Sequence, residues 1–274
     1  VQAVIAAKRI GLPVIVRGDS QLGTPRSMVK RMGKRLLYPR LLRQFDAALY
    51  VGRNSKAYYE LYHYPGERLF FSPHCVDNSW FSERATHAVR RELRKRLGVA
   101  DSDRVLLFAG KLQPFKRPLD LVEAAAELHH CGYTIHVLVA GSGELDGELS
   151  RRATELGVSL HMLGFRNQTE MPAAYAAADV LVLPSNASET WGLVANEALA
   201  CGTPVMVSDA CGCAPDLAAD GFAGAVFPVG DVRALSEGLR RLISLPPDAD
   251  AIANKIQDYS VERAADGVCE ALSF

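Results

Sequence analysis

Two glutamates, Glu189 and Glu197, stand eight positions apart with Gly192 between them. An apolar run at 178–185 precedes them and another at 205–208 follows, a pattern typical of strand, loop, helix and strand. Glu189 is expected in the loop and Glu197 inside the helix. In a parallel sheet such loops lie at the carboxyl ends of the strands, where ligands bind. The start of the helix also offers unpaired N–H groups and a positive dipole end to an anion.

The chemistry expected of Glu197 follows from its apolar neighbours, which include Val194, Ala198 and Leu199. Most paired glutamates on helices are merely solvated, but a buried carboxylate is costly unless a donor meets it. A sugar hydroxyl, such as that of a nucleotide ribose, is one candidate donor.

Two lysines, Lys111 and Lys116, follow the apolar run 105–110, which predicts a buried strand. Lysines on a turn at the carboxyl end of a strand are well placed to neutralise a diphosphate. Standing alone, they would be typical of any charged loop that precedes a helix, and residues 119–129 do predict an amphipathic helix.

Around these residues, strand and helix patterns alternate, which predicts an α/β fold with parallel sheets. The expected strands are 13–17, 47–51, 69–71, 105–110, 135–140, 160–166, 178–185, 205–208 and 222–228. The expected helices include 3–9, 54–62, 119–129, 232–242 and 261–272. His136 alternates with core residues of its strand and is expected to be packed rather than catalytic.

The run E-T-W-G-L-V-A-N-E-A-L-A-C-G-T-P-V, from Glu189 to Val205, resembles the E-x7-E motif of retaining glycosyltransferases of family GT4, which have the GT-B fold. Residues 110–116 resemble the family's G-(R/K)-L-x-x-x-K segment. Residues 73–77 resemble its P-x-G-V-D segment, with His74-Cys75 where N-G is usual. The resemblance implies two Rossmann-like domains with parallel sheets.

By this likeness the chain is a hexosyltransferase that moves a sugar from a nucleoside-diphosphate sugar to a glycan or lipid-linked acceptor, in polysaccharide or glycolipid biosynthesis. UDP is favoured as the nucleotide, with GDP or ADP open, and neither a cofactor nor a metal is implied. Lys111 and Lys116 would hold the diphosphate, Glu197 the ribose and Glu189 the donor sugar. Further donor contacts are implied at Gly192, Leu193, Val194, Phe165, Arg166 and Gly141.

On the acceptor side, many members carry a His after the strand that corresponds to 14–16, where this chain reads Arg17-Gly18-Asp19-Ser20. Asp19 is the nearest candidate for an acceptor-side role. A role in capping its own loop is the alternative. Two other functions also stay open: a sugar-nucleotide 2-epimerase of the same fold, and a non-catalytic module that binds a nucleotide sugar.

The expected domains are a partial acceptor-side domain at 1–100, a donor-binding domain at 101–258, and a helix at 259–274 that crosses back to the first. The family's opening strand and Gly-rich loop are absent and the chain begins with Val, so an N-terminal truncation is expected. Such a chain should bind a nucleoside diphosphate but turn over poorly. An unpaired strand edge would invite self-association or a partner fragment.

A basic stretch lies between the first two expected strands, at 26–43, and contains no acidic residue. Met28, Met32 and Leu36 repeat every fourth residue, which predicts an amphipathic helix that Pro39 should break or kink. Such a face suits an anionic membrane surface or lipid-linked acceptor at the inner face of the plasma membrane. A solvated basic face is the alternative.

The composition narrows the function further. With 31 basic and 31 acidic residues the formal net charge is zero, which argues against a dedicated nucleic-acid binder. No apolar run is long enough to span a bilayer. Six cysteines occur without a C-x-x-C pair, which favours reduced thiols in a cytoplasmic protein over disulfides or a zinc site.

Overall fold

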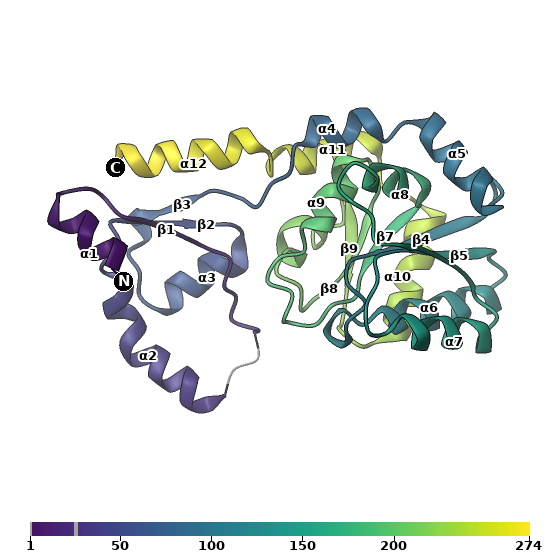
Figure 1. The fold of residues 1–274 in the computed structure, drawn as a ribbon, viewed down its shortest axis with the longest axis horizontal. Coiled ribbons are helices and arrows are strands. Elements are labelled where there is room, and N and C mark those ends of the chain that lie inside the picture. Colours follow the sequence, from purple (N-terminus) through teal and green to yellow (C-terminus); the bar gives the residue numbers. More distant parts are fainter. Residues whose placement is uncertain (1, 25–26) are drawn as a thin grey trace.

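The computed structural model describes residues 2–24 and 27–274, which form two α/β units (Figure 1). The first unit has a three-stranded sheet of order β1-β2-β3, and the second a six-stranded sheet of order β6-β5-β4-β7-β8-β9. Every pairing between these strands is parallel. The strands are β1 (Ile15–Gly18), β2 (Ala47–Tyr50), β3 (Leu69–Phe71), β4 (Arg104–Ala109), β5 (Ile135–Ala140), β6 (Ser159–Gly164), β7 (Val180–Leu183), β8 (Val205–Ser208) and β9 (Gly224–Phe227). The prediction of two Rossmann-like units, the first with few strands, is confirmed.

The apolar runs form central strands because both faces of the second sheet are covered by helices. All four residues of β7 and all four of β8 are buried. Strands buried on both faces have continuous apolar sequences rather than alternating ones. Helices α6, α7 and α10 cover one face, and α8 and α9 cover the other. Their bounds are α6 (Pro118–His130), α7 (Asp146–Glu155), α8 (Met171–Ala177), α9 (Leu193–Ala200) and α10 (Val232–Ser244).

The strand order of the second sheet determines where a ligand can bind. Numbered from β4, the order is 3-2-1-4-5-6, the doubly wound arrangement in which the direction of winding reverses between the first and fourth strands. Loops after these two strands, β4 and β7, turn to opposite faces and leave a crevice at their carboxyl ends. The loop after β4 carries Lys111 and Lys116 and is called the lysine loop. The loop after β7 carries Glu189 and is called the glutamate loop.

The first sheet carries four helices of its own: α1 (Gln2–Arg9), α2 (Met28–Leu42), α3 (Arg53–Leu61) and α12 (Val261–Ser273). A break or a kink was predicted at Pro39, and the break is wrong, because α2 continues to Leu42. Pro39 lies in the last turn, where it removes one N–H, and the next turn still closes through the Arg43 N–H, which donates to the Pro39 carbonyl. Strand β1 begins at Ile15 rather than at Pro13. Pro13 has no N–H, and the Val14 N–H donates to Asp46 Oδ2 at 2.8 Å instead.

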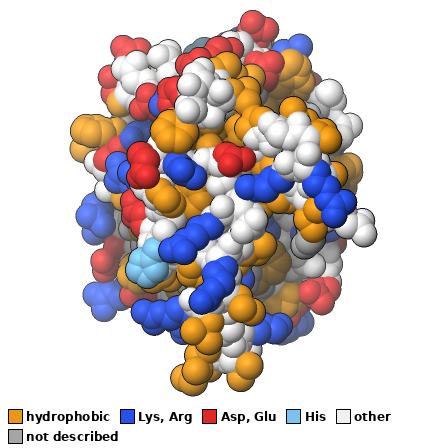
Figure 2. Space-filling view, turned by 90° about the vertical axis from the view of Figure 1, so that its left-hand side faces the viewer, with side chains coloured by type: hydrophobic (Ala, Val, Ile, Leu, Met, Phe, Trp, Pro, Cys, Tyr) orange, Lys and Arg blue, Asp and Glu red, His pale blue; other side chains and the backbone are white. Residues whose placement is uncertain are grey.

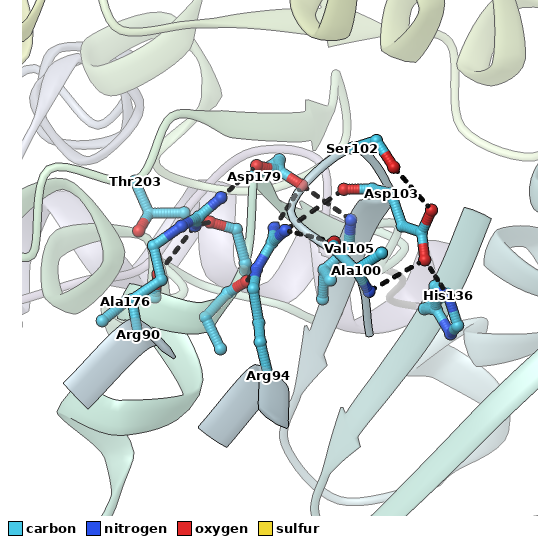
Figure 3. Close-up of polar contacts among 12 residues, drawn as sticks. Arg90, Arg94, Ala100, Ser102, Asp103, Val105, His136, Ala176, Asp179 and Thr203 are labelled. Carbon is cyan, nitrogen blue, oxygen red and sulfur yellow. Dashed lines mark hydrogen bonds and ion pairs between the residues drawn. The ribbon is translucent and has the colours of Figure 1, made fainter. Parts of the chain in front are cut away.

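Helices α4 (Asn78–Arg84) and α5 (His87–Leu97) precede β4 in the chain but pack against α8 and α9 of the second unit. A partly buried network of hydrogen bonds and ion pairs fixes α5 there (Figure 3). Arg90 and Arg94 each donate to a different oxygen of Asp179, both at 2.7 Å. Asp179 Oδ2 also accepts from the Val105 N–H at 2.7 Å, which ties both arginines to the start of β4. Helices α4 and α5, which lie before the predicted domain boundary at 100, therefore cover the second unit.

The C-terminal helix returns to the first unit, where α12 packs on β2 and β3 (Figure 1). It follows α11 (Ala249–Gln257), which packs on α9 of the second unit. The two segments that connect the units lie together. Asn78 Nδ2 donates to the Ile256 carbonyl at 3.0 Å, and Ser72 Oγ donates to the Ala264 carbonyl at 2.9 Å.

Within the described ranges, no helix combines the length and apolar character that a membrane crossing would need. All six cysteines are free thiols. Of the basic stretch, Arg26 lies outside the described residues. Short helical turns complete the structure at η1 (Gly66–Arg68), η2 (Pro114–Lys116) and η3 (Ala214–Ala218).

Candidate functional site

The lysine loop and the glutamate loop meet in the crevice between β4 and β7. Lys116 Nζ forms an ion pair with Glu189 Oε2, and both side chains are largely buried. Ser185 Oγ donates to the same carboxylate oxygen at 3.1 Å. The backbones are also joined, since the Asn186 N–H donates to the Phe115 carbonyl at 2.8 Å. The structure therefore brings together Lys116 and Glu189, two of the residues predicted for the site, and adds Ser185, which the sequence did not indicate.

Glu197 lies inside α9, as expected, and its partner in the structure is a protein hydroxyl. Tyr175 Oη, from the fully buried Tyr175 of α8, donates to Glu197 Oε2 at 2.6 Å. Burial raises the pKa of the Glu197 carboxyl above its ordinary value of 4.5, and the hydrogen bond from Tyr175 opposes that rise. Among the described residues, no hydrogen bond is formed to the second oxygen, Oε1.

Gly192 caps the start of α9 in a conformation that only glycine adopts easily. Its φ is +103°, and a Cβ there would lie 2.5 Å from Leu183 Cδ2 at the end of β7. The helix can therefore start directly behind the strand. Leu193 and Val194 form its first turn, whose N–H groups have no intrahelical acceptor.

Lys111 lies at the end of β4, and its exposed side chain has no ion-pair partner among the described residues. Gly141 follows β5 and packs directly on this loop. A Cβ on Gly141 would lie 1.8 Å from the Gly110 carbonyl oxygen, so no side chain fits. The G-x-G turn thus supports the backbone next to Lys111. That leaves one fixed ammonium, Lys116, and one free one, Lys111, at the same end of the sheet.

Phe165 and Arg166 follow β6, two strands away from β4. The Phe165 side chain is 79% exposed. Arg166 pairs with Glu170 at 2.8 Å, and its Nε is buried without a hydrogen-bond partner in the described part of the chain. Gly164, the last residue of β6, bridges to Gly141. The two residues therefore lie at the carboxyl edge of the same sheet as the lysine and glutamate loops.

Asp19 comes from the first unit and reaches the glutamate loop. Its Oδ2 accepts from Thr190 Oγ1 at 2.8 Å and lies 3.9 Å from His74 Nε2. Burial and the nearby Arg17 lower the pKa of His74, which disfavours the charged imidazole. Asp19 thus contacts the residue next to Glu189.

Trp191 anchors the glutamate loop to α9, a contact that the sequence did not indicate. Its indole Nε1 donates to Asn196 Oδ1 at 2.7 Å, and Asn196 Nδ2 donates to the His74 carbonyl at 3.0 Å. The chain of contacts runs from the glutamate loop through α9 to the segment 73–77. His136, in contrast, is packed as expected, between His161 at 2.9 Å and Asp103 at 3.2 Å. In the described ranges, no three His, Cys, Asp or Glu side chains are grouped so that they could hold a metal ion.

Comparison with known proteins gives a family and a fold. The model of the family "Glycosyl transferases group 1" matches residues 89–259. The D-inositol 3-phosphate glycosyltransferases of Mycobacterium tuberculosis and Mycobacterium bovis are 36% identical over 163 residues, which cover 57% of this chain and 33% of theirs. The chain thus spans about a third of the length of these curated relatives.

Among solved structures, Anabaena HepE in complex with UDP is similar with a TM-score of 0.84 at 24% identity, covering 99% of this chain and 75% of that one. Sucrose-phosphate synthase from Thermosynechococcus elongatus has a TM-score of 0.76 at 20% identity, with 99% and 70% covered. At these identities the likeness shows the fold, which is that of the GT-B glycosyltransferases.

Proposed function

Since this chain belongs to the glycosyl transferases group 1 family, we propose that its protein transfers a sugar from a nucleoside-diphosphate sugar to an acceptor. The observation that carries the proposal is the ion pair of Lys116 with Glu189 at the crevice between β4 and β7, with Lys111 at the end of β4 beside it. UDP is the nucleotide we favour, because HepE, which shares the fold, was solved with UDP bound.

The two lysines supply the positive charge that the reaction requires. As the bond to the anomeric carbon breaks, negative charge develops on the departing diphosphate. Fixed cations in a site that excludes water stabilise that charge without reorganisation. Lys116 is held in place by Glu189, whereas Lys111 is free to meet the phosphates. The first-turn N–H groups of α9, at Leu193 and Val194, are directed at an anion in the same way.

The two glutamates have different tasks in this proposal. Glu197 accepts hydrogen bonds from ribose hydroxyls through the oxygen that Tyr175 does not occupy. Glu189 faces the donor sugar, a hexose, and its pairing with Lys116 holds its carboxylate next to an oxocarbenium-like centre. Phe165 and Arg166 are proposed to meet the base, and Gly141 to let the chain approach the donor. Retention of anomeric configuration belongs to the proposal as well.

For the acceptor we propose a glycan or an anionic lipid-linked sugar presented at a membrane surface. Five apolar side chains on α2 are between 63% and 81% exposed: Met28, Val29, Met32, Leu36 and Leu37. Lys30, Arg31 and Arg35 lie exposed among them. Figure 2 shows basic and apolar side chains gathered on the lower part of this face. Lys34 is not free for lipid, since its Nζ donates to Tyr58 Oη at 2.5 Å and lies over the Tyr38 ring.

The test is incubation with UDP-, GDP- and ADP-sugars, scored for released diphosphate and for product by NMR of the anomeric proton. We expect Lys116→Met and Glu189→Gln to lose turnover at least 100-fold, as when one stabilising donor is removed from such a site. Lys8→Met is the matched control, because Lys8 pairs with Asp46 at the surface of the first unit.

Other outcomes identify the alternatives. Isomerised sugar nucleotide without transfer would show an epimerase. Tight nucleotide binding with neither product nor diphosphate release would show a binding module. An inverted anomeric configuration in the product would refute retention while leaving transfer in place.

A further inference from the structure

Gln21 joins the first unit to the loop that carries Glu189. It lies in the segment after β1 and is only 3% exposed. Its Nε2 donates to the Glu189 carbonyl at 2.8 Å and lies within 3.3 Å of the carbonyls of Ala187 and Ala210. Its Oε1 accepts from Asn54 Nδ2 at 3.4 Å, which fixes which end of the amide faces the carbonyls.

The peptide of Glu189 is thereby held from two sides. From the second unit, the Gly212 N–H donates to the Glu189 carbonyl at 3.1 Å. From the first unit, Gln21 donates to the same carbonyl, and Asp19 accepts from the neighbouring Thr190 at 2.8 Å. Asn54 ties the two sides together, since its Nδ2 also donates to the Gly212 carbonyl at 3.3 Å. Backbone held in this way determines where the carboxylate of Glu189 points.

We propose that Gln21 is a positioning residue: it fixes the loop that carries Glu189, and Glu189 is placed for the donor sugar only when both units are together. This rests on the role that the proposed function gives to Glu189. Within the described ranges, Gln21 forms no hydrogen bond to Lys111, Lys116 or Glu197, the residues proposed for the diphosphate and the ribose. Nucleotide binding and sugar placement should therefore separate in variants of Gln21.

Two variants of nearly equal shape test the hydrogen bonds. Gln21→Met fills the same space but donates nothing, so the carbonyls of Ala187, Glu189 and Ala210 lose the Gln21 donor, and Glu189 keeps only the Gly212 N–H. Gln21→Glu is isosteric, and its ionised carboxylate would face those carbonyl oxygens. Only its protonated form can donate, so its defect should diminish as the pH falls toward the carboxyl pKa, whereas the defect of Gln21→Met should not. Ser72→Ala is the control, because Ser72 is equally buried and also joins distant segments, but away from the crevice.

The first measurement is amide hydrogen exchange of the complete chain without ligand. We expect exchange in 187–191 to rise at least 10-fold in Gln21→Met, with β4 unchanged, and to stay at the wild-type level in Ser72→Ala. Equal exchange in Gln21→Met and wild type would overturn the proposal. This measurement decides whether Gln21 holds the loop even if the protein proves to have another function.

The second measurement compares the affinities for UDP and UDP-glucose by calorimetry, together with turnover of the nucleotide sugar that the donor panel selects. In Gln21→Met we expect the affinity for UDP to stay within 2-fold of wild type and kcat to fall at least 10-fold. If wild type binds UDP-glucose more tightly than UDP, the variant should lose that difference in affinity. Equal weakening of UDP and UDP-glucose, in step with a lower Tm, would show that Gln21 is only a structural part of the interface. Absence of nucleotide binding by the wild type would instead refute the proposed function.

Discussion

Glu197 and Tyr175 are adjacent although 22 residues separate them in the chain. Tyr175 occupies one of the two carboxylate oxygens in the described part of the chain, and a hydrogen bond from a ligand to a charged acceptor contributes about 1.5–3 kcal/mol. We therefore expect Glu197→Gln to weaken UDP binding by roughly 10- to 150-fold, measured by calorimetry. Glu155→Gln, at an exposed carboxylate on α7, should change nothing. Unchanged affinity of Glu197→Gln for UDP, GDP and ADP alike would refute the ribose role.

The same carboxylate makes stability depend on pH. Burial raises the folded-state pKa of Glu197 above its ordinary value of 4.5. Any stability from this group is therefore fully present below pH 4.5 and is lost as the pH rises through the raised pKa. Glu197→Gln removes this loss. We expect its unfolding free energy, relative to wild type, to rise from pH 4.5 upward in urea titrations. A constant difference across that range would contradict the argument.

The sequence singled out the charged residues of the candidate site but not the neutral residues that contact them. Glu189, Glu197 and Lys116 stand in recognisable spacings, because the chemistry fixes both residue type and position. Tyr175 stands in a run of alanines, where an aromatic residue is typical of any packed helix. Gln21 follows a short strand and is one polar residue among several. Neither has a local pattern that marks it, since its role exists only through contacts made by folding.

Among the elements, α5 depends most on a single charged group. Arg94 is 2% exposed, and Asp179 pairs with it and with Arg90. Removing one partner of a buried ion pair leaves a charge uncompensated, at a cost of about 3–5 kcal/mol. We expect Asp179→Asn to lower the unfolding free energy by about 3 kcal/mol, because Arg94 keeps its carbonyl acceptors. Asp220→Asn, which breaks a pair with Lys255 at the surface, should cost less than about 1 kcal/mol.

Helix α2 is the element that we expect to meet a membrane. Each basic residue near an anionic surface contributes about 1 kcal/mol. Ala at Lys30, Arg31 and Arg35 should therefore weaken co-sedimentation with phosphatidylserine vesicles by roughly 100-fold, and added salt should do the same. Ala at Arg91, Lys95 and Arg96, all exposed on α5, is the control of equal charge. Equal pelleting of wild type with neutral and anionic vesicles would favour a solvated basic face.

The sequence predicted most strands to within a few residues, because apolar runs of that length have few alternatives. The errors lie at proline and in packing. Pro13 was included in a strand that begins only at Ile15, and a break, one of the two outcomes predicted at Pro39, does not occur because α2 continues through its last turn. No pattern in the sequence of α4 and α5 indicates that they pack on the second unit, because the apolar face of a helix does not specify which unit it will pack against.

The contacts of α4 and α5 with the second unit predict where the molecule can be cut into a fragment that folds on its own. Residues 72–260 contain the second sheet together with α4 and α5, whereas 101–258 lack both helices. We expect the longer fragment to unfold cooperatively and to bind UDP as the complete chain does. The shorter one leaves Asp179 without Arg94 and exposes the apolar faces of α8 and α9, so it should aggregate. Calorimetric unfolding and size-exclusion chromatography of both fragments are the measurements. Equal behaviour would favour the boundary at 100.

The chain leaves the first sheet after Phe71 and comes back to it at Val261, so the second unit is an insertion within the first. For α12 to reach β2 and β3 from an unfolded chain, a very long loop must close, at an entropic cost of about 4–5 kcal/mol. The folded second unit offsets that cost, because its two ends lie side by side at Asn78 and Ile256. The folded second unit therefore stabilises the first sheet. A change in the second unit that separates Asn78 from Ile256 would therefore also weaken the first sheet, although it lies outside that sheet.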